Sequence, residues 1–163
     1  MTEVTCGIFL VDPYDQLLIV HSTNARWNTW GIPKGIPEEC ESYKEAAIRE
    51  LYEETYLDIE SVQINYLGSS KYLKCNKILE AFWILLDKPI IMEDLKCLSM
   101  VEKDGKEPFP ELDKYMTVSL DDAHKWLHQT QIDLLPLLKE KIMQEKGCKT
   151  VSIKPKKIVI KKT

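Results

Sequence analysis

The chain has 163 residues, of which 44% are hydrophobic and 29% charged, proportions that suit one globular domain and exclude a fibrous or fully disordered protein. Its longest apolar stretch, residues 78–86, is too short to span a bilayer, so we expect no contact with a membrane. We expect no secretory signal either, because Glu3 stands where such a signal carries positive charge. The 5 cysteines are widely spaced and lack a C-x-x-C pair, which argues against disulfides and zinc and indicates a cytoplasmic protein.

The net charge of −4 conceals a basic C-terminal end. Residues 146–163 contain seven lysines and no acidic residue, whereas residues 1–145 contain 15 basic and 26 acidic residues. We therefore expect one domain over 1–145, followed by a lysine-rich tail over 146–163. The tail is either a solvated terminus or a segment that contacts an anionic partner.

The first third of the chain predicts a hairpin, a loop and then a helix. Residues 5–12 and 17–21 are rich in β-forming residues and are separated by a turn at 13–16. Residues 22–40 carry turn chemistry and predict a long loop. Ser42, with a glutamate three residues later, forms a capping-box pattern that predicts the start of a helix.

The remaining chain predicts a mixture of strands and helices. Further strands are expected at 62–69, at 78–86 and near 114–118, and the polar residues 99–110 predict a surface loop. The sequence also predicts two C-terminal helices, at 120–127 and 132–143. This order of elements indicates an α/β (α+β) fold, either α+β or an α/β/α sandwich.

Three glutamates lie on one face of the helix predicted after Ser42. Glu50, Glu53 and Glu54 are spaced i, i+3, i+4, which places their carboxylates within an arc of about 100°. Their mutual repulsion favours a hard divalent cation such as Mg²⁺, which prefers oxygen ligands and commonly binds together with phosphates. Taken alone this spacing is weak, because most acidic helix faces are simply solvated.

The residues around these glutamates match a longer pattern. Eight of them fit the spacing G-x5-E-x7-R-E-U-x-E-E-x-G-U, in which U is aliphatic: Gly35, Glu41, Arg49, Glu50, Leu51, Glu53, Glu54 and Leu57. This segment resembles the signature of the Nudix hydrolases at every fixed position except one, where Tyr56 replaces glycine. A glycine there commonly takes the left-handed conformation that ends a helix, so Tyr56 predicts strain at the helix end without the loss of a metal ligand.

The resemblance implies a Mg²⁺-dependent hydrolase of phosphoric anhydrides, with Mn²⁺ as a substitute, on an α/β/α sandwich around a mixed β-sheet. Glu50, Glu53 and Glu54 match the family's metal-ligand and base positions. The backbone carbonyl before the box glycine, here that of Lys34, often completes the metal shell in the family.

Two further positions carry roles by the same resemblance. Arg49 and Glu41 match residues that pair with the box carboxylates and orient them, and Arg49 is counted among the candidate catalytic residues. Glu111, in the run FPELDK, resembles a late glutamate that reaches back to the metals in some members. The alternative for Glu111 is an ordinary loop residue before an edge strand.

The substrate is suggested by residues 30–35, WGIPKG. They resemble the W-x-x-P-K-G lead-in of Nudix members that act on dinucleoside polyphosphates and diphosphoinositol polyphosphates. Related lead-ins occur in RNA 5′-pyrophosphohydrolases. We expect a dinucleoside polyphosphate, and the alternatives are an RNA 5′ end, a nucleotide sugar such as ADP-ribose, and a catalytically silent protein that binds nucleotide or RNA. Lys34 is a candidate phosphate contact.

Other candidate substrate-binding residues follow one predicted strand. Lys71, Lys74 and Lys77 suit polyphosphate as point charges, and Tyr72 among them could stack on a base. Trp27 could also stack on a base. The alternative is that the lysines are solvated and that Trp27 is a packing anchor. The oligomeric state is left open by the sequence.

Overall fold

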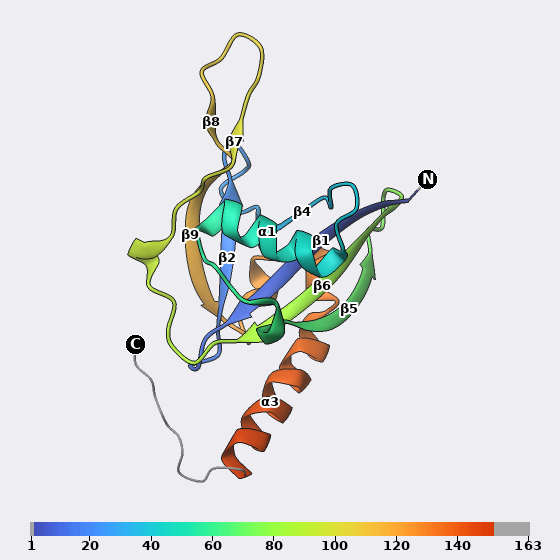
Figure 1. Cartoon of the computed structure of the whole chain (residues 1–163), viewed down its shortest axis with the longest axis vertical. Helices are drawn as coiled ribbons and strands as arrows, with labels where there is room; N and C mark the ends of the chain where they lie inside the picture. The colour runs from blue at the N-terminus through green and yellow to red at the C-terminus, as the bar shows by residue number, and fades with distance from the viewer. Residues whose placement is uncertain (1, 152–163) are drawn as a thin grey trace.

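A mixed β-sheet forms the centre of the structure, a computed structural model that describes residues 2–151 (Figure 1). Its central strand, β1 (Glu3–Val11), pairs in parallel with β6 (Lys77–Leu85) over nine residues. β1 also meets β2 (Gln16–Ser22) in the opposite direction. The first two strands and their turn therefore form the hairpin expected from the sequence.

Shorter and outer strands complete the sheet. β5 (Asn65–Lys71) pairs antiparallel with β6, and β9 (Leu112–Ser119) pairs antiparallel with β2. Two short strands bring the long loop onto the sheet: β3 (Trp30–Gly31) pairs with β2, and β4 (Lys34–Gly35) pairs with β1. The loop predicted at 22–40 is thus anchored at two points, both next to the Nudix-like box.

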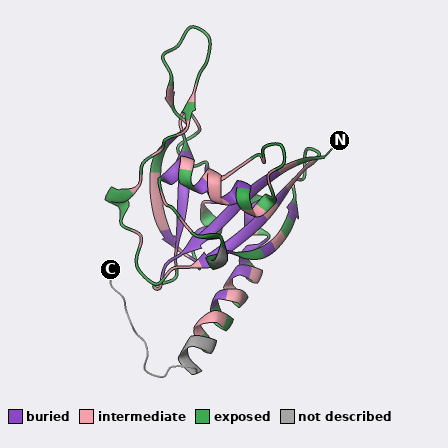
Figure 2. Cartoon of the chain, in the orientation of Figure 1, coloured by how far each residue is buried: buried purple, intermediate pink, exposed green. Residues whose placement is uncertain are grey.

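Helices cover both faces of this sheet (Figure 1). α1 (Tyr43–Thr55) packs on one face against alternate β1 side chains, including Ile8 and Leu10. The other β1 side chains, Phe9 and Val11, belong to a second core with residues of the C-terminal helices. Buried side chains accordingly concentrate in the central strands (Figure 2). The other helical segments are α2 (Gln129–Ile132), α3 (Leu135–Val151) and the 3-10 turns Ser61–Gln63, Met92–Asp94 and Ala123–Lys125. The α/β/α sandwich around a mixed sheet is confirmed.

The start of α1 confirms the predicted capping box. The Ser42 hydroxyl accepts a hydrogen bond from the Glu45 backbone N–H at 3.1 Å, and the Glu45 carboxylate accepts one from the Ser42 N–H at 2.9 Å. Two backbone donors that the first helical turn leaves unpaired are satisfied in this way.

The end of α1 is held by distant parts of the chain. Tyr56 adopts the left-handed conformation, with φ 70° and ψ 10°, although it is not glycine. The last four helical carbonyls are all hydrogen-bonded: Tyr52 O by Tyr56 N–H, Glu53 O by Leu98 and Ser99 N–H, Glu54 O by the Tyr115 hydroxyl, and Thr55 O by Lys96 N–H. The helix end is therefore fixed by tertiary contacts as well as by its own cap.

The helix predicted at 120–127 is wrong. This segment forms turns and the single 3-10 turn Ala123–Lys125, because Leu127 is drawn into an extended bridge with Trp30. The helix predicted at 132–143 is split into α2 and α3. α3 begins just before Pro136, which suits a first helical turn, where its missing N–H is not needed.

The loop expected at 99–110 contains a small hairpin of β7 (Met100–Val101) and β8 (Phe109–Pro110), which projects away from the body of the molecule (Figure 1). Of the predicted tail, 146–151 continue α3, and residues 152–163 lie outside the described residues. Within residues 2–151, no helix has both the length and the apolar character needed to cross a membrane.

Candidate active site

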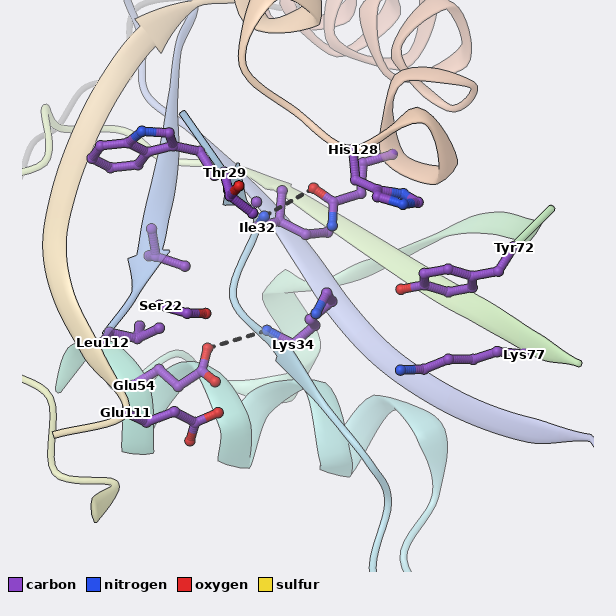
Figure 3. Close-up of a pocket in the computed structure, with 14 residues that line it drawn as sticks. Ser22, Thr29, Ile32, Lys34, Glu54, Tyr72, Lys77, Glu111, Leu112 and His128 are labelled. Atoms are coloured by element: carbon purple, nitrogen blue, oxygen red, sulfur yellow. Dashed lines mark hydrogen bonds between the residues drawn. The ribbon is translucent and has the colours of Figure 1, made fainter. Parts of the chain in front are cut away.

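A pocket of about 210 Å³ lies where the long loop, the second half of α1 and the β8–β9 turn meet the ends of β5 and β6 (Figure 3). Its lining includes four charged residues and two aromatic residues near them: Lys34, Glu54, Lys77, Glu111, Trp30 and Tyr72. Four of them, Lys34, Glu54, Tyr72 and Glu111, are predicted site residues, from parts of the chain far apart in sequence.

Glu54 is the most deeply buried carboxylate of this site. Only 3% of the residue is exposed, and its Oε1 accepts a hydrogen bond from the Lys34 backbone N–H at 3.2 Å. Burial, together with the nearby negative charges of Glu111 and Glu50, raises the pKa of Glu54 to about 9. A buried carboxyl group of this kind is stabilised either by a bound proton or by a nearby cation.

Glu50 occupies the space above Gly35. A Cβ atom added at Gly35 would lie 2.0 Å from the Glu50 carboxyl carbon, so only glycine admits the carboxylate at this point. Burial raises the pKa of Glu50, and the adjacent Arg49 guanidinium, which donates to Oε2 at 3.0 Å, opposes that rise. The box glycine is therefore required for close approach of α1 to β4.

Arg49 organises the exposed side of the cluster. It makes a two-point contact with Glu41, at 2.8 and 3.0 Å, and also donates to Glu53 at 3.2 Å. A further bond to the Ile36 carbonyl ties α1 to the long loop. The Arg49 hydrogen bonds hold the pKa of Glu41 below its ordinary value. Arg49 thus contacts Glu41, Glu50 and Glu53 of the box, and the orienting role that the resemblance implied for Arg49 and Glu41 stays a prediction.

Glu111 reaches the pocket from the turn between β8 and β9, close to Glu54 (Figure 3). Its carboxylate accepts a hydrogen bond from the Ser99 hydroxyl at 2.7 Å. Its backbone N–H donates to the Ser99 carbonyl, and its carbonyl accepts from the Thr23 N–H, both at 2.9 Å. The loop glutamate is thus held in place on two sides.

The opposite wall carries cationic and aromatic groups (Figure 3). The Lys77 ammonium lies 5.1 Å from the Tyr72 ring centre and 3.7 Å from Glu3, and the Tyr72 ring lies 5.4 Å from that of His128. In the described part of the chain, the Tyr72 hydroxyl is buried without a hydrogen-bond partner. Burial also lowers the pKa of Lys34, although Glu54 opposes this change.

Three predicted substrate-binding residues lie outside the lining of this pocket. Trp27 is 77% exposed on the surface of the long loop, where its carbonyl accepts from the Trp30 indole N–H at 2.9 Å. Lys71 is exposed at the end of β5, and Lys74 is exposed on the β5–β6 connection. The predicted site residues Arg49, Glu50 and Glu53 do not line this pocket either.

Of the three lysines proposed as phosphate contacts, Lys77 lines the pocket, because its position at the start of β6 places it opposite Tyr72. Two other lining residues, His128 and Gln131, lie between the two predicted C-terminal helices and were not among the substrate-binding candidates. Gln131 is 1% exposed, and its side-chain oxygen accepts from the Ile32 N–H at 3.0 Å, which fixes the loop that carries Lys34.

Comparison with known proteins decides the family. A sequence model of the NUDIX domain matches residues 1–138. The chain belongs to the Nudix family. The resemblance carried by Gly35, Glu41, Arg49 and the three glutamates is thereby confirmed, and so is membership of a class of hydrolases that act on phosphoric anhydrides.

A curated relative shares part of this Nudix sequence. The m7GpppN-mRNA hydrolase dcap-2 of Caenorhabditis elegans is 45% identical over 58 residues, which is 35% of this chain and 7% of that protein. The match therefore covers only a small part of that longer protein, and it concerns local sequence only.

Solved structures share the Nudix fold at low sequence identity. An Ap4A hydrolase of C. elegans in a binary complex has a TM-score of 0.67 and 18% identity, with 88% of this chain and 99% of that chain covered. The NUDIX domain of Shewanella oneidensis NrtR, complexed with ADP ribose, has a TM-score of 0.66 and 16% identity over 87% and 89%. At these identities the likeness establishes the fold.

The Nudix box has the chemistry to hold a divalent cation. Its carboxylates supply the oxygen ligands that Mg²⁺ prefers, and burial together with the charges of Glu111 and Glu50 raises the pKa of Glu54. Within residues 2–151, no three acidic, histidine or cysteine side chains already surround one point. The carboxylates would therefore have to turn toward a shared cation, and Glu50 and Glu53 would loosen their contacts with Arg49.

Proposed function

We propose that this chain is a Mg²⁺-dependent pyrophosphohydrolase that cleaves a nucleoside diphosphate linked to another moiety. The observation that carries the proposal is the pocket itself, with Glu54 and Glu111 on one side, Lys77 and Tyr72 on the other, and Lys34 between them. A polyphosphate chain has the charge to contact the cationic wall directly and the acidic wall through a cation.

The residues of the acidic wall would bind the metal and handle the proton of water. Glu50, Glu53, Glu54, Glu111 and the Lys34 carbonyl would hold Mg²⁺, or Mn²⁺ in its place. When bound, the ion would neutralise phosphate charge and lower the pKa of a coordinated water. A carboxylate of the cluster, Glu50 or the more distal Glu111, would accept the proton of the attacking water.

Other residues would position these groups and the substrate. Arg49 contacts Glu50 and Glu53 and would return each carboxylate to a defined orientation. Among residues 2–151 the buried Tyr72 hydroxyl has no hydrogen-bond partner, and the Lys77 and Lys34 ammonium groups supply positive charge. We propose that these three groups bind phosphate oxygens. Trp27, Lys71 and Lys74 would contribute only to parts of the substrate that extend beyond the pocket.

Dinucleoside polyphosphates are the substrates that we favour. The WGIPKG lead-in supports them, and the fold extends over almost the whole length of an Ap4A hydrolase. The free cysteines at positions 6, 40, 75 and 97 support a cytoplasmic location, where such nucleotides would be met. We propose residues 1–145 as the catalytic domain.

An RNA 5′ end is the second candidate substrate. The local identity to an mRNA hydrolase supports it, and the lysine-rich segment 146–163 would add phosphate contacts. A catalytically silent protein that only binds nucleotide or RNA is disfavoured, because Glu50, Glu53 and Glu54 are all present. ADP-ribose is a further candidate substrate and is included in the hydrolysis screen.

A hydrolysis screen tests this proposal. The full chain would be incubated with Mg²⁺ or Mn²⁺ and with dinucleoside polyphosphates, ADP-ribose, nucleoside triphosphates or RNA bearing a 5′-triphosphate or a cap. We expect the highest kcat/KM for a dinucleoside polyphosphate. Reaction in ¹⁸O-labelled water would identify the attacked phosphorus. Binding of nucleotide without metal-dependent turnover of any of these compounds would contradict the proposal.

A further inference from the structure

Ser99 and Glu111 face each other at the base of the β7–β8 hairpin. Ser99 immediately precedes β7 and Glu111 immediately follows β8, and the Glu111 N–H donates to the Ser99 carbonyl at 2.9 Å. The rest of the hairpin projects away from the body of the molecule (Figure 1). The position of Glu111 in the pocket therefore depends on how this base is held.

The Ser99 side chain contacts the Glu111 carboxylate itself. Its hydroxyl donates to Oε1 of Glu111 at 2.7 Å, a short bond to a charged acceptor. A glutamate on a turn has several free rotations, and this bond removes most of them by fixing one carboxylate oxygen. The other oxygen remains available to a ligand in the pocket.

The Ser99 backbone is joined to α1. Its N–H donates to the Glu53 carbonyl at 3.0 Å, and the neighbouring Leu98 N–H donates to the same carbonyl at 2.7 Å. Ser99 thus holds Glu111 at a defined distance from the helix that carries Glu53 and Glu54. On the far side, Thr23 donates hydrogen bonds to the Pro110 and Glu111 carbonyls, so it supports the backbone of this turn.

We propose that Ser99 is a positioning residue for catalysis, which acts by orienting the Glu111 carboxylate toward the α1 glutamates. This inference rests on the proposed function, because it assumes that Glu111 serves in the reaction. Groups that orient a metal ligand through a hydrogen bond typically change metal affinity or activity by about 10- to 100-fold when they are removed. We expect about a tenfold effect for Ser99.

The test compares Ser99→Ala with Ser99→Thr and Ser61→Ala. Ser99→Ala keeps both backbone contacts, so it should fold normally, with about tenfold lower kcat, a KM within about twofold of wild type and a weaker Mn²⁺ affinity by electron paramagnetic resonance. Ser99→Thr, which keeps the hydroxyl, should recover most of the loss. Ser61 is exposed on the 3-10 turn after α1 and does not line the pocket, so Ser61→Ala should match wild type.

A double-mutant cycle with Glu111→Ala separates the possible failures. If Ser99 acts through Glu111, then Ser99→Ala should have no further effect on kcat in the Glu111→Ala background. The inference would be overturned if Ser99→Ala lowered kcat equally in both backgrounds. It would also be overturned if the single variant Ser99→Ala kept wild-type kcat and Mn²⁺ affinity. Either result would leave the proposed function intact. If wild type itself shows no metal-dependent turnover, the proposed function fails instead.

Discussion

Glu54 is a deeply buried carboxyl group whose neighbours are mainly acidic, although Lys34 opposes part of their effect. Its pKa of about 9 lies far above the ordinary value of a glutamate, because of burial and the charges of Glu111 and Glu50. In the metal-free protein, Glu54 therefore contributes its full stabilisation only below about pH 4, where the unfolded chain is also protonated. That contribution is lost as pH rises toward 9.

Glu54→Gln should stabilise the metal-free protein. Glutamine stays neutral at every pH and can still accept from the Lys34 N–H. The variant should exceed wild type in free energy of unfolding at pH 8, and the difference should grow by up to about 1.4 kcal/mol per pH unit between about pH 4 and 9. Urea unfolding in a chelating buffer across this range would measure it. If the difference in free energy of unfolding did not depend on pH, the pKa of Glu54 would not be raised in the folded protein.

Gly35 is a second residue that the geometry of the site constrains, because no Cβ atom fits there. Gly35→Ala would place a methyl group inside the Glu50 carboxylate, so we expect a loss of about 1–3 kcal/mol in stability and at least a tenfold loss of kcat. Thermal unfolding and steady-state kinetics would measure the two effects. Gly147→Ala is a matched control, because it enters open space within α3 and should be neutral or slightly stabilising. Wild-type activity in Gly35→Ala would show that Glu50 is dispensable.

At the scale of elements, α1 combines a local start with a non-local end. Its capping box is fixed by residues three apart, whereas its last carbonyls are held by Lys96, Leu98, Ser99 and Tyr115. These distant donors explain why the helix can end in Tyr56 at a conformation that glycine would take without cost. The contact of the Tyr52 and Tyr56 rings, with centres 5.6 Å apart, compensates part of the penalty.

Tyr56→Gly should therefore gain stability of up to about 1 kcal/mol, since it relieves a left-handed non-glycine residue. Its kcat should stay within about twofold of wild type, because no proposed metal ligand moves. Chemical denaturation and a hydrolysis assay would measure both quantities. Tyr56→Asn, which also tolerates this conformation, serves as a second variant. A large change in activity in both would show that the helix end controls the site.

The accuracy of the sequence-based predictions follows the range of the interactions involved. The hairpin, the capping box and α1 were predictable, because each depends on neighbouring residues. The helix expected at 120–127 failed because Leu127 pairs with Trp30, almost a hundred residues away. For the same reason the sequence could not distinguish Lys77, which lines the pocket, from Lys71 and Lys74, which do not line it. Glu111 was found only through the resemblance, since its hydrogen bond to Ser99 is non-local.

At the scale of the whole molecule, the fold brings two oppositely charged surfaces together around one pocket. α1 and the β8–β9 turn supply Glu54 and Glu111, and strands of the sheet supply Lys34 and Lys77 (Figure 3). This separation of charge suits a substrate that carries several phosphates and binds with a cation. Neither surface alone would discriminate such a substrate from other anions or cations.

Lys77→Ala and Lys74→Ala form a matched pair that tests this arrangement. Both remove one positive charge at this end of the sheet: Lys74 lies on the β5–β6 connection and Lys77 begins β6, and of the two only Lys77 lines the pocket. We expect KM for a dinucleoside polyphosphate to rise about tenfold for Lys77→Ala, which corresponds to about 1.4 kcal/mol, and to change less than twofold for Lys74→Ala. Steady-state kinetics at one ionic strength would decide. Equal effects would indicate a diffuse electrostatic contribution instead of a specific contact.

Metal-dependent hydrolysis at the α1 glutamates is the central property that we propose for this protein. The decisive measurement is the hydrolysis rate of a dinucleoside tetraphosphate by wild type and by Glu54→Gln, each with saturating Mg²⁺ and with a chelator. We predict turnover by wild type that the chelator abolishes, and a loss of about 100-fold or more in Glu54→Gln. Mg²⁺-dependent hydrolysis by Glu54→Gln at nearly the wild-type rate would contradict the assignment of this site.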